Sequence, residues 1–171
     1  RKEMFRRMEV LSRMRLNNIS RFRTKEEMPY IVLVVDEFSQ LWPRKSSDAP
    51  QDYTIKKKAH AYLIDILCLA RAVGIHVVIS TQRPDKDILP GQLKANLPAT
   101  LAFRTRNMDN AKILDTPLSC FIPREIKGRA IWNFDIEREV QVMYIDPDYI
   151  ITRLPEPVTK PIMQKDRLIA S

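Results

Sequence analysis

The fold class of this chain is decided by one stretch, Tyr30-Ile31-Val32-Leu33-Val34-Val35-Asp36-Glu37-Phe38. Its unbroken run of aliphatic and β-branched residues predicts a strand that is buried on both faces, as in a parallel sheet. Two carboxylates follow directly, and the C-terminal ends of strands are where open α/β sheets bind their ligands. The stretch therefore predicts an α/β protein with a ligand site at Asp36 and Glu37.

A buried strand that runs into two acids is the Walker B pattern. In P-loop NTPases the first acid holds Mg²⁺, usually through water, and the second polarises the attacking water. The Gly-rich G-x-x-x-x-G-K-[ST] loop that cradles phosphates is missing from this sequence, which has three glycines in all. The chain thus carries the hydrolytic half of a nucleotide site without its phosphate-binding half.

A second strand with a polar end supports the nucleotide site. An amphipathic helix is predicted over about residues 53–73, and the strand Ile75–Ser80 then completes a right-handed βαβ unit. Thr81 and Gln82 follow this strand, where a polar side chain can hydrogen-bond a γ-phosphate or the attacking water. The same residues also suit an ordinary strand-to-loop turn.

The remainder of the chain predicts shorter elements. We expect a loop with a short helix over residues 90–96, a third strand near Thr100–Phe103 and a helix around Asp109–Leu114. Two later segments, Gly128–Phe134 and Val140–Ile145, are expected to form an antiparallel pair. Residues 151–171 contain several prolines and little periodicity, which predicts a linker or tail.

Composition limits the class of protein. The 171 residues carry a net charge of +8, which favours polyanionic partners such as nucleic acid. Much of this charge lies in Arg1–Arg23, where a solvated outer helix face is the default interpretation. No signal peptide or membrane-spanning run is recognisable, and the distant Cys68 and Cys120 predict free thiols, with Cys68 buried, in a reducing cytosol.

Three blocks of sequence resemble the FtsK/SpoIIIE (HerA-like) family of DNA-pumping ATPases: YIVLVVDEF at Tyr30–Phe38, ARAVGIHVVISTQRP at Ala70–Pro84 and KANLPATLAF at Lys94–Phe103. The resemblance extends from about Glu3 to Ile145. It implies a RecA-like P-loop NTPase core, with a mainly parallel sheet flanked by helices and a C-terminal antiparallel pair. It further implies a homo-oligomeric, hexameric ring that hydrolyses ATP with Mg²⁺ and moves double-stranded DNA.

The resemblance also assigns roles at the two strand ends. It makes Asp36 the Mg²⁺-associated acid and Glu37 the catalytic base. Gln82, together with Thr81, becomes the sensor of the γ-phosphate. Arg83 is either a phosphate contact or a salt-bridged structural arginine.

The chain departs from the family at its arginines. Members often carry Ser-Arg before Ile-Leu-Asp, where this chain has Asn110-Ala111-Lys112, and many have an arginine where Thr100 stands. Arg104 and Arg106, at the exit of the same strand, are the candidate substitutes in nucleotide binding. Their alternative role is that of solvated basic residues. The short basic stretch Pro123–Arg129 looks more like the coupling ATPases of integrative conjugative elements.

The resemblance sets the expected domain organisation and location. Residues 1–150 would be the C-terminal portion of a motor domain, with the Walker A segment preceding Arg1, so that this portion alone is inactive. The parent would serve conjugation, or chromosome segregation at cell division. It would act in the cytoplasm at the cytosolic face of the bacterial membrane, with any membrane anchor outside this segment. The alternatives are a type VII secretion-like ATPase that moves protein, and a non-catalytic binding module.

Overall fold

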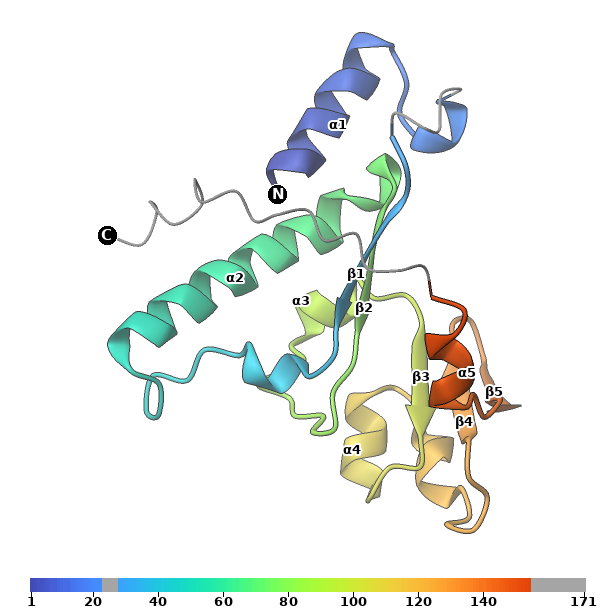
Figure 1. Cartoon of the computed structure of the whole chain (residues 1–171). Coiled ribbons are helices and arrows are strands. Elements are labelled where there is room, and N and C mark those ends of the chain that lie inside the picture. The colour runs from blue at the N-terminus through green and yellow to red at the C-terminus, as the bar shows by residue number, and fades with distance from the viewer. Residues whose placement is uncertain (23–27, 155–171) are drawn as a thin grey trace. The chain divides into compact units, whose positions relative to one another are not determined.

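The computed structural model describes residues 1–22 and 28–154 of the chain (Figure 1). It divides the chain into two units, Arg1–Gln141 and Val142–Ser171. The first unit contains α1 (Lys2–Arg13), β1 (Ile31–Val35), α2 (Pro50–Leu69), β2 (Ile75–Ile79), α3 (Gly91–Lys94), β3 (Thr100–Phe103), α4 (Met108–Ile113), β4 (Arg129–Asn133) and β5 (Glu137–Gln141). Short 3-10 helices lie at η1 (Ile19–Arg21), η2 (Phe38–Gln40), η3 (Arg71–Val73) and η4 (Pro117–Phe121). The second unit contains α5 (Pro147–Ile151).

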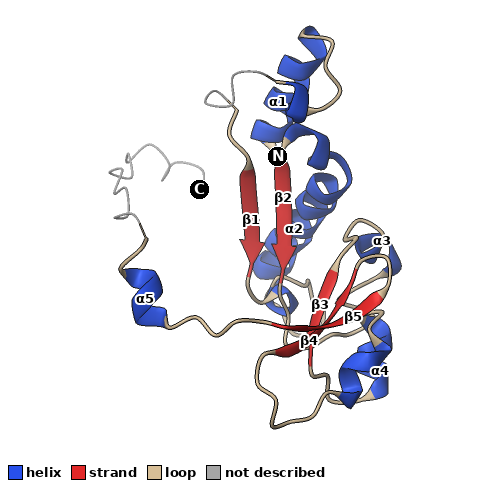
Figure 2. Ribbon diagram, turned by 90° about the vertical axis from the view of Figure 1, so that its right-hand side faces the viewer, coloured by secondary structure: helices blue, strands red, loops and turns tan. Residues whose placement is uncertain are grey.

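The predicted βαβ unit is present. β1 and β2 pair in parallel, from Ile31 opposite Ile75 to Val35 opposite Ile79, and α2 connects them (Figure 2). α2 begins at Pro50, three residues before the predicted start, because proline is favoured in the first turn of a helix. η3 follows, and Gly74 then turns the chain into β2 with φ of +75°, a conformation that favours glycine.

One face of the parallel pair packs on the core, and the opposite face is exposed. On the packed face, Val35, Val77 and Ile79 contact a cluster built around the buried Phe38 and Leu63. The prediction of a strand buried on both faces is wrong for the described residues. Val32 and Val34 of β1 are 60% and 63% exposed, because no described helix covers the face that they share. An apolar run indicates a strand, but it does not by itself supply a covering layer.

The second sheet is antiparallel and has the strand order β3-β4-β5. An antiparallel pair is present as predicted, but its second strand spans Glu137–Gln141 rather than Val140–Ile145. β3 joins this hairpin rather than the parallel pair. The register runs from Thr100 opposite Asn133 to Phe103 opposite Ala130. A parallel βαβ unit combined with an antiparallel sheet confirms the predicted α/β fold class.

α1 is fixed to the core by a buried arginine. Arg7 is 2% exposed; it donates to the Val73 carbonyl at 3.1 Å and pairs with Glu3 at 2.8 Å. Hydrogen bonds from Arg6, and next from Arg7, lower the pKa of Glu3 to about 2. Part of the N-terminal positive charge is therefore neutralised within α1 itself.

Two other expectations are affected by the structure. Cys68 is a free thiol, as predicted, but it is exposed rather than buried. The division into a motor portion over 1–150 and a tail over 151–171 stays a prediction, because the unit boundary follows Gln141 and residues 155–171 lie outside the described part.

Candidate active site

The candidate site is the edge of the parallel pair where both strands end. Because β1 and β2 run in the same direction, their C-terminal ends lie side by side. The pairing continues past them: the Ser80 amide donates to the Val35 carbonyl at 2.8 Å, and the Phe38 amide donates to the Ser80 carbonyl at 2.9 Å. The segments that carry the two predicted groups of site residues are thus hydrogen-bonded to each other.

Glu37 is held by hydrogen bonds from its own turn and from the end of β2. Its Oε1 accepts from the Ser39 amide at 3.0 Å and from Thr81 Oγ1 at 2.9 Å, and its Oε2 accepts from the Gln82 amide at 3.0 Å. Hydrogen bonding from the Ser39 side chain, followed by that from the Gln82 amide, outweighs burial and lowers the pKa of Glu37 to about 2. The carboxylate is therefore ionised at neutral pH and anchored to both strand ends.

Asp36 is exposed and has no hydrogen-bond or ion-pair partner within residues 1–22 and 28–154. No group of three or more His, Cys, Asp or Glu side chains that could hold a metal occurs in the same part of the chain. Mg²⁺ in nucleotide sites is usually bound through one or two carboxylates, substrate phosphates and water. A free Asp36 beside the fixed Glu37 fits that manner of binding, and it does not fit an all-protein metal cage.

The three residues Thr81, Gln82 and Arg83, which follow β2, differ in their exposure and in their contacts with Glu37. Gln82 contributes its amide to Glu37, and its side chain is exposed. The Arg83 side chain is also exposed and has no acidic partner in the described part of the chain, so the salt bridge that one interpretation required is not seen there. The Thr81 hydroxyl contacts Glu37.

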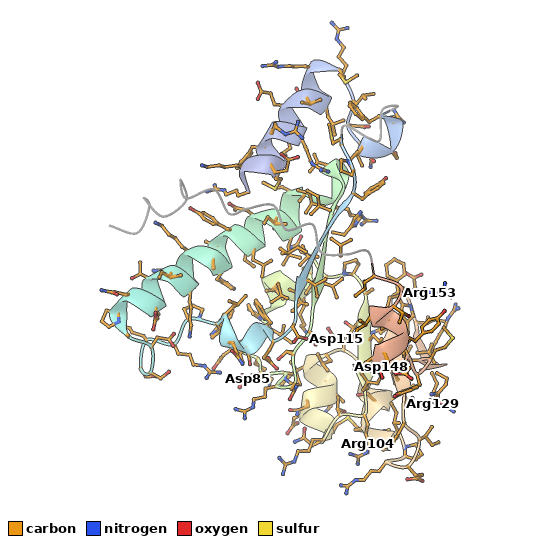
Figure 3. All side chains as sticks on the ribbon, viewed as in Figure 1. Asp85, Arg104, Asp115, Arg129, Asp148 and Arg153 are labelled. Atoms are coloured by element: carbon orange, nitrogen blue, oxygen red, sulfur yellow. The ribbon has the colours of Figure 1, made fainter. Side chains whose placement is uncertain are left out.

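Arg104 and Arg106 are presented at the exit of β3 on either side of a buried threonine (Figure 3 labels Arg104). Thr105 is 8% exposed, and its hydroxyl lies 2.9 Å from Ser119 Oγ. Both arginines are exposed and lack an ion-pair partner among the described residues. The structure brings neither arginine into hydrogen-bond contact with the group at Asp36, Glu37 and Gln82.

Sequence reasoning missed two residues next to Glu37. Glu37 is the N-cap of η2, so its side chain accepts a hydrogen bond from the Ser39 backbone amide. The sequence signal for this contact was an acidic residue placed where it could cap a short helix. Phe38 is fully buried, with its ring centroid 6.4 Å from that of His60 and 6.2 Å from that of Trp42. Phe38 thus anchors the turn on which the two acids lie.

A cavity of about 180 Å³ lies between β1, η2 and α2. It is lined mainly by apolar side chains, including Leu33, Val35, Leu63 and Ile66. His60 Nε2 is shielded from solvent and has no hydrogen-bond partner among the described residues, and burial lowers the pKa of this histidine. A cavity with so few polar groups does not suit a triphosphate.

No family model matches the chain. Individual relatives match it over most of its length. It is 35% identical to the DNA translocase SpoIIIE of Bacillus subtilis, with 88% of this chain and 21% of that protein covered. It is 33% identical to the DNA translocase FtsK of Chlamydia trachomatis, with 82% of this chain and 20% of that protein covered. The chain therefore spans about a fifth of the length of these relatives.

Solved structures are similar to the chain as well. The pCW3 conjugation coupling protein TcpA, solved as a monomer with ATPγS, matches with a TM-score of 0.80 and 27% identity, over 86% of this chain and 43% of that one. The type VII secretion ATPase EccC of Thermomonospora curvata matches with a TM-score of 0.65 and 20% identity, over 85% and 17%. At that identity the likeness to EccC shows the fold alone. The predicted similarity to the FtsK/SpoIIIE family and the RecA-like fold class are confirmed.

Proposed function

We propose that this chain, as a segment of the FtsK/SpoIIIE family, forms the hydrolytic part of an ATP-driven motor that moves double-stranded DNA. One observation carries the proposal: Glu37 at the end of β1 is hydrogen-bonded to the end of β2, beside a free Asp36. The likeness to SpoIIIE, named a DNA translocase, and to TcpA, named a conjugation coupling protein, supports DNA as the substrate. The process served would be conjugative DNA transfer or chromosome segregation.

Each residue of the site has a proposed task. Asp36 would hold Mg²⁺, which supplies positive charge against the phosphates when ATP is bound. Glu37 would orient the attacking water and accept its proton. The exposed side-chain amide of Gln82 would contact the γ-phosphate. The exposed guanidinium of Arg83 is suited to a phosphate oxygen. All four lie on strand ends that are hydrogen-bonded to each other, which favours fixed positions during hydrolysis.

Arg104 and Arg106 are proposed to contact nucleotide across a subunit boundary in a hexameric ring. Guanidinium groups are suited to such contacts because they remain charged and bind phosphate in a fixed geometry. The buried Thr105 between them turns both side chains toward solvent. This arrangement supports an intermolecular contact, since no described acid neutralises either arginine.

DNA is proposed to contact exposed basic side chains through its phosphates, largely without base readout. On α1, Arg6 pairs with Glu3 and Arg13 pairs with Glu9, which reduces their availability. Arg15 and Arg21 are exposed without an ion-pair partner in the described part of the chain. These two are better candidates for phosphate contacts than the helix as a whole.

Binding of duplex DNA by the full-length protein should fall steeply with salt. Each phosphate that a basic side chain neutralises adds about −0.9 to the slope of log K against log salt concentration. We expect Arg15→Gln and Arg21→Gln to reduce the magnitude of that slope by about one each, measured by fluorescence anisotropy. Arg13→Gln is the matched control and should change the slope less. Absence of duplex binding at low salt would contradict the proposal and favour a protein substrate.

Two alternatives remain distinguishable. A type VII secretion-like ATPase would hydrolyse ATP without response to DNA, and the fold likeness to EccC fits it. A non-catalytic binding module would show no turnover that depends on Glu37. Measuring ATP hydrolysis with and without duplex DNA separates both from a DNA translocase.

The proposed location is the cytosolic face of a bacterial membrane, with this segment itself making no membrane contact. Among the described residues, no helix has the length and apolar character needed to span a bilayer. Any membrane anchor would belong to another part of the protein.

A further inference from the structure

The Thr81 hydroxyl occupies the centre of a hydrogen-bond network between the two strand ends. Its oxygen accepts from the Arg83 amide at 3.2 Å, and its hydrogen is donated to Glu37 Oε1 at 2.9 Å. A second acceptor, the Arg83 carbonyl, is farther away at 3.4 Å. The loop after β2 is thereby tied to the carboxylate after β1.

A hydroxyl group has one hydrogen to donate. Oxygens of an ionised phosphate accept hydrogen bonds and cannot donate them. While Thr81 donates to Glu37, it has no hydrogen left for a γ-phosphate oxygen. Thr81 therefore cannot sense phosphate in this arrangement, whereas the exposed side-chain amide of Gln82 can.

The network also determines how Glu37 is oriented. An ionised carboxylate has about four acceptor sites, two on each oxygen. The Ser39 amide and the Thr81 hydroxyl occupy those on Oε1, and the Gln82 amide occupies one on Oε2. The Ser39 side chain also hydrogen-bonds the carboxylate, so groups from both strand ends together fix its orientation.

We propose that Thr81 is a positioning residue, which acts with Ser39 and the Gln82 amide to hold the Glu37 carboxylate in the orientation that receives the attacking water. The proposal rests on the proposed function, because it takes Glu37 as the residue that orients this water. It changes the role of Thr81 from a nucleotide contact to a residue that acts through Glu37.

The test compares Thr81→Val, which removes the hydroxyl at nearly constant shape, with Thr81→Ser, which retains it. Steady-state ATP hydrolysis by the full-length protein is measured over a range of Mg·ATP concentrations. Thr81→Val should lower kcat about tenfold and change KM less than about twofold, because binding is unaffected and orientation is lost. Thr81→Ser should keep most of the turnover. Thr54→Val removes an exposed hydroxyl that bonds within α2 and is the matched control.

A second comparison tests whether Thr81 acts through Glu37. In a Glu37→Gln background, single-turnover hydrolysis should show no further loss on adding Thr81→Val, because residues that act as a unit are not additive. A raised KM with unchanged kcat, wild-type turnover in Thr81→Val, failure of Thr81→Ser to rescue, or an additive loss in the double variant would each overturn the proposal. Thr81→Ala serves in place of Thr81→Val if the valine variant does not fold.

The proposed function and the proposed role of Thr81 are contradicted by different results. If Glu37→Gln alone retains wild-type turnover, the proposed function and the role of Thr81 are both wrong. If Glu37→Gln is inactive while Thr81→Val is unaffected, the role of Thr81 alone is wrong.

Discussion

Replacement of Glu37 by Gln in the full-length protein should reduce ATP turnover by a factor of about 10² to 10⁴, the usual contribution of a general base. ATP binding should remain close to that of the wild type, because the amide has nearly the same shape and keeps an acceptor oxygen for the Ser39 and Thr81 donors. The Gln82 backbone amide loses its acceptor, because the NH₂ group of the new glutamine side chain replaces Glu37 Oε2. Turnover is measured by phosphate release, and binding by a fluorescent ATP analogue.

The control for this loss is Glu125→Gln, which neutralises an exposed acid that has no hydrogen-bond partner among the described residues. It should retain full turnover. If Glu37→Gln retains turnover as well, Glu37 is not the base, and the non-catalytic alternative gains support. A variant that loses ATP binding together with turnover would point to misfolding rather than to lost chemistry.

Phe38→Ala should destabilise the chain by about 3–5 kcal/mol, the usual cost of truncating a buried aromatic side chain. Phe38 is fully buried, and its ring packs near those of His60 and Trp42. Natural domains are stable by about 5–15 kcal/mol, so the loss is a large share of the total. Because the Phe38 backbone also joins the two strand ends, the site should become disordered with the core.

Urea denaturation measures this effect, with Phe121→Ala as the matched control. Phe121 is 70% exposed, so its truncation should change the free energy of unfolding by no more than about 0.5 kcal/mol. Equal stability losses in the two variants would contradict the assignment of Phe38 to the core beside the site.

The parts of the fold that sequence predicted are those determined by local pattern. The apolar run of β1 and the apolar spacing of α2 predicted a βαβ unit, and parallel pairing then required Asp36 and Glu37 to lie near Thr81 and Gln82. The β4–β5 hairpin followed from two strand-like segments, but its second strand begins three residues before the predicted Val140, in the charged segment that was expected to be the turn. In each case the pattern of residues close together in the sequence was enough to predict the element.

The parts that were not predicted depend on contacts between distant residues. The exposure of Val32 and Val34 depends on whether another layer covers their face, and the pairing of β3 with β4 depends on competition between two sheets. The donation of the Thr81 hydroxyl to Glu37 depends on side-chain rotamers in a folded loop. No periodicity in the sequence contains that information.

Chemical identity in the site was therefore easier to predict than hydrogen-bond roles. Asp36 and Glu37 were recognisable from residue type and position at a strand end. The role of Thr81 required knowledge of which acceptor its single hydrogen reaches, and the role of Ser39 required knowledge that Glu37 begins η2. The roles of all these site residues, Asp36 and Glu37 included, and those of Gln82, Arg83, Arg104 and Arg106 stay predictions.

The central claim is that ATP hydrolysis at Glu37 drives movement along double-stranded DNA. Its most direct test is the displacement of a third-strand oligonucleotide from a duplex by the full-length protein, with Glu37→Gln as the inactive counterpart. We expect ATP-dependent displacement by the wild type and none by Glu37→Gln. Wild-type protein that binds the duplex and hydrolyses ATP but leaves the third strand in place would contradict it.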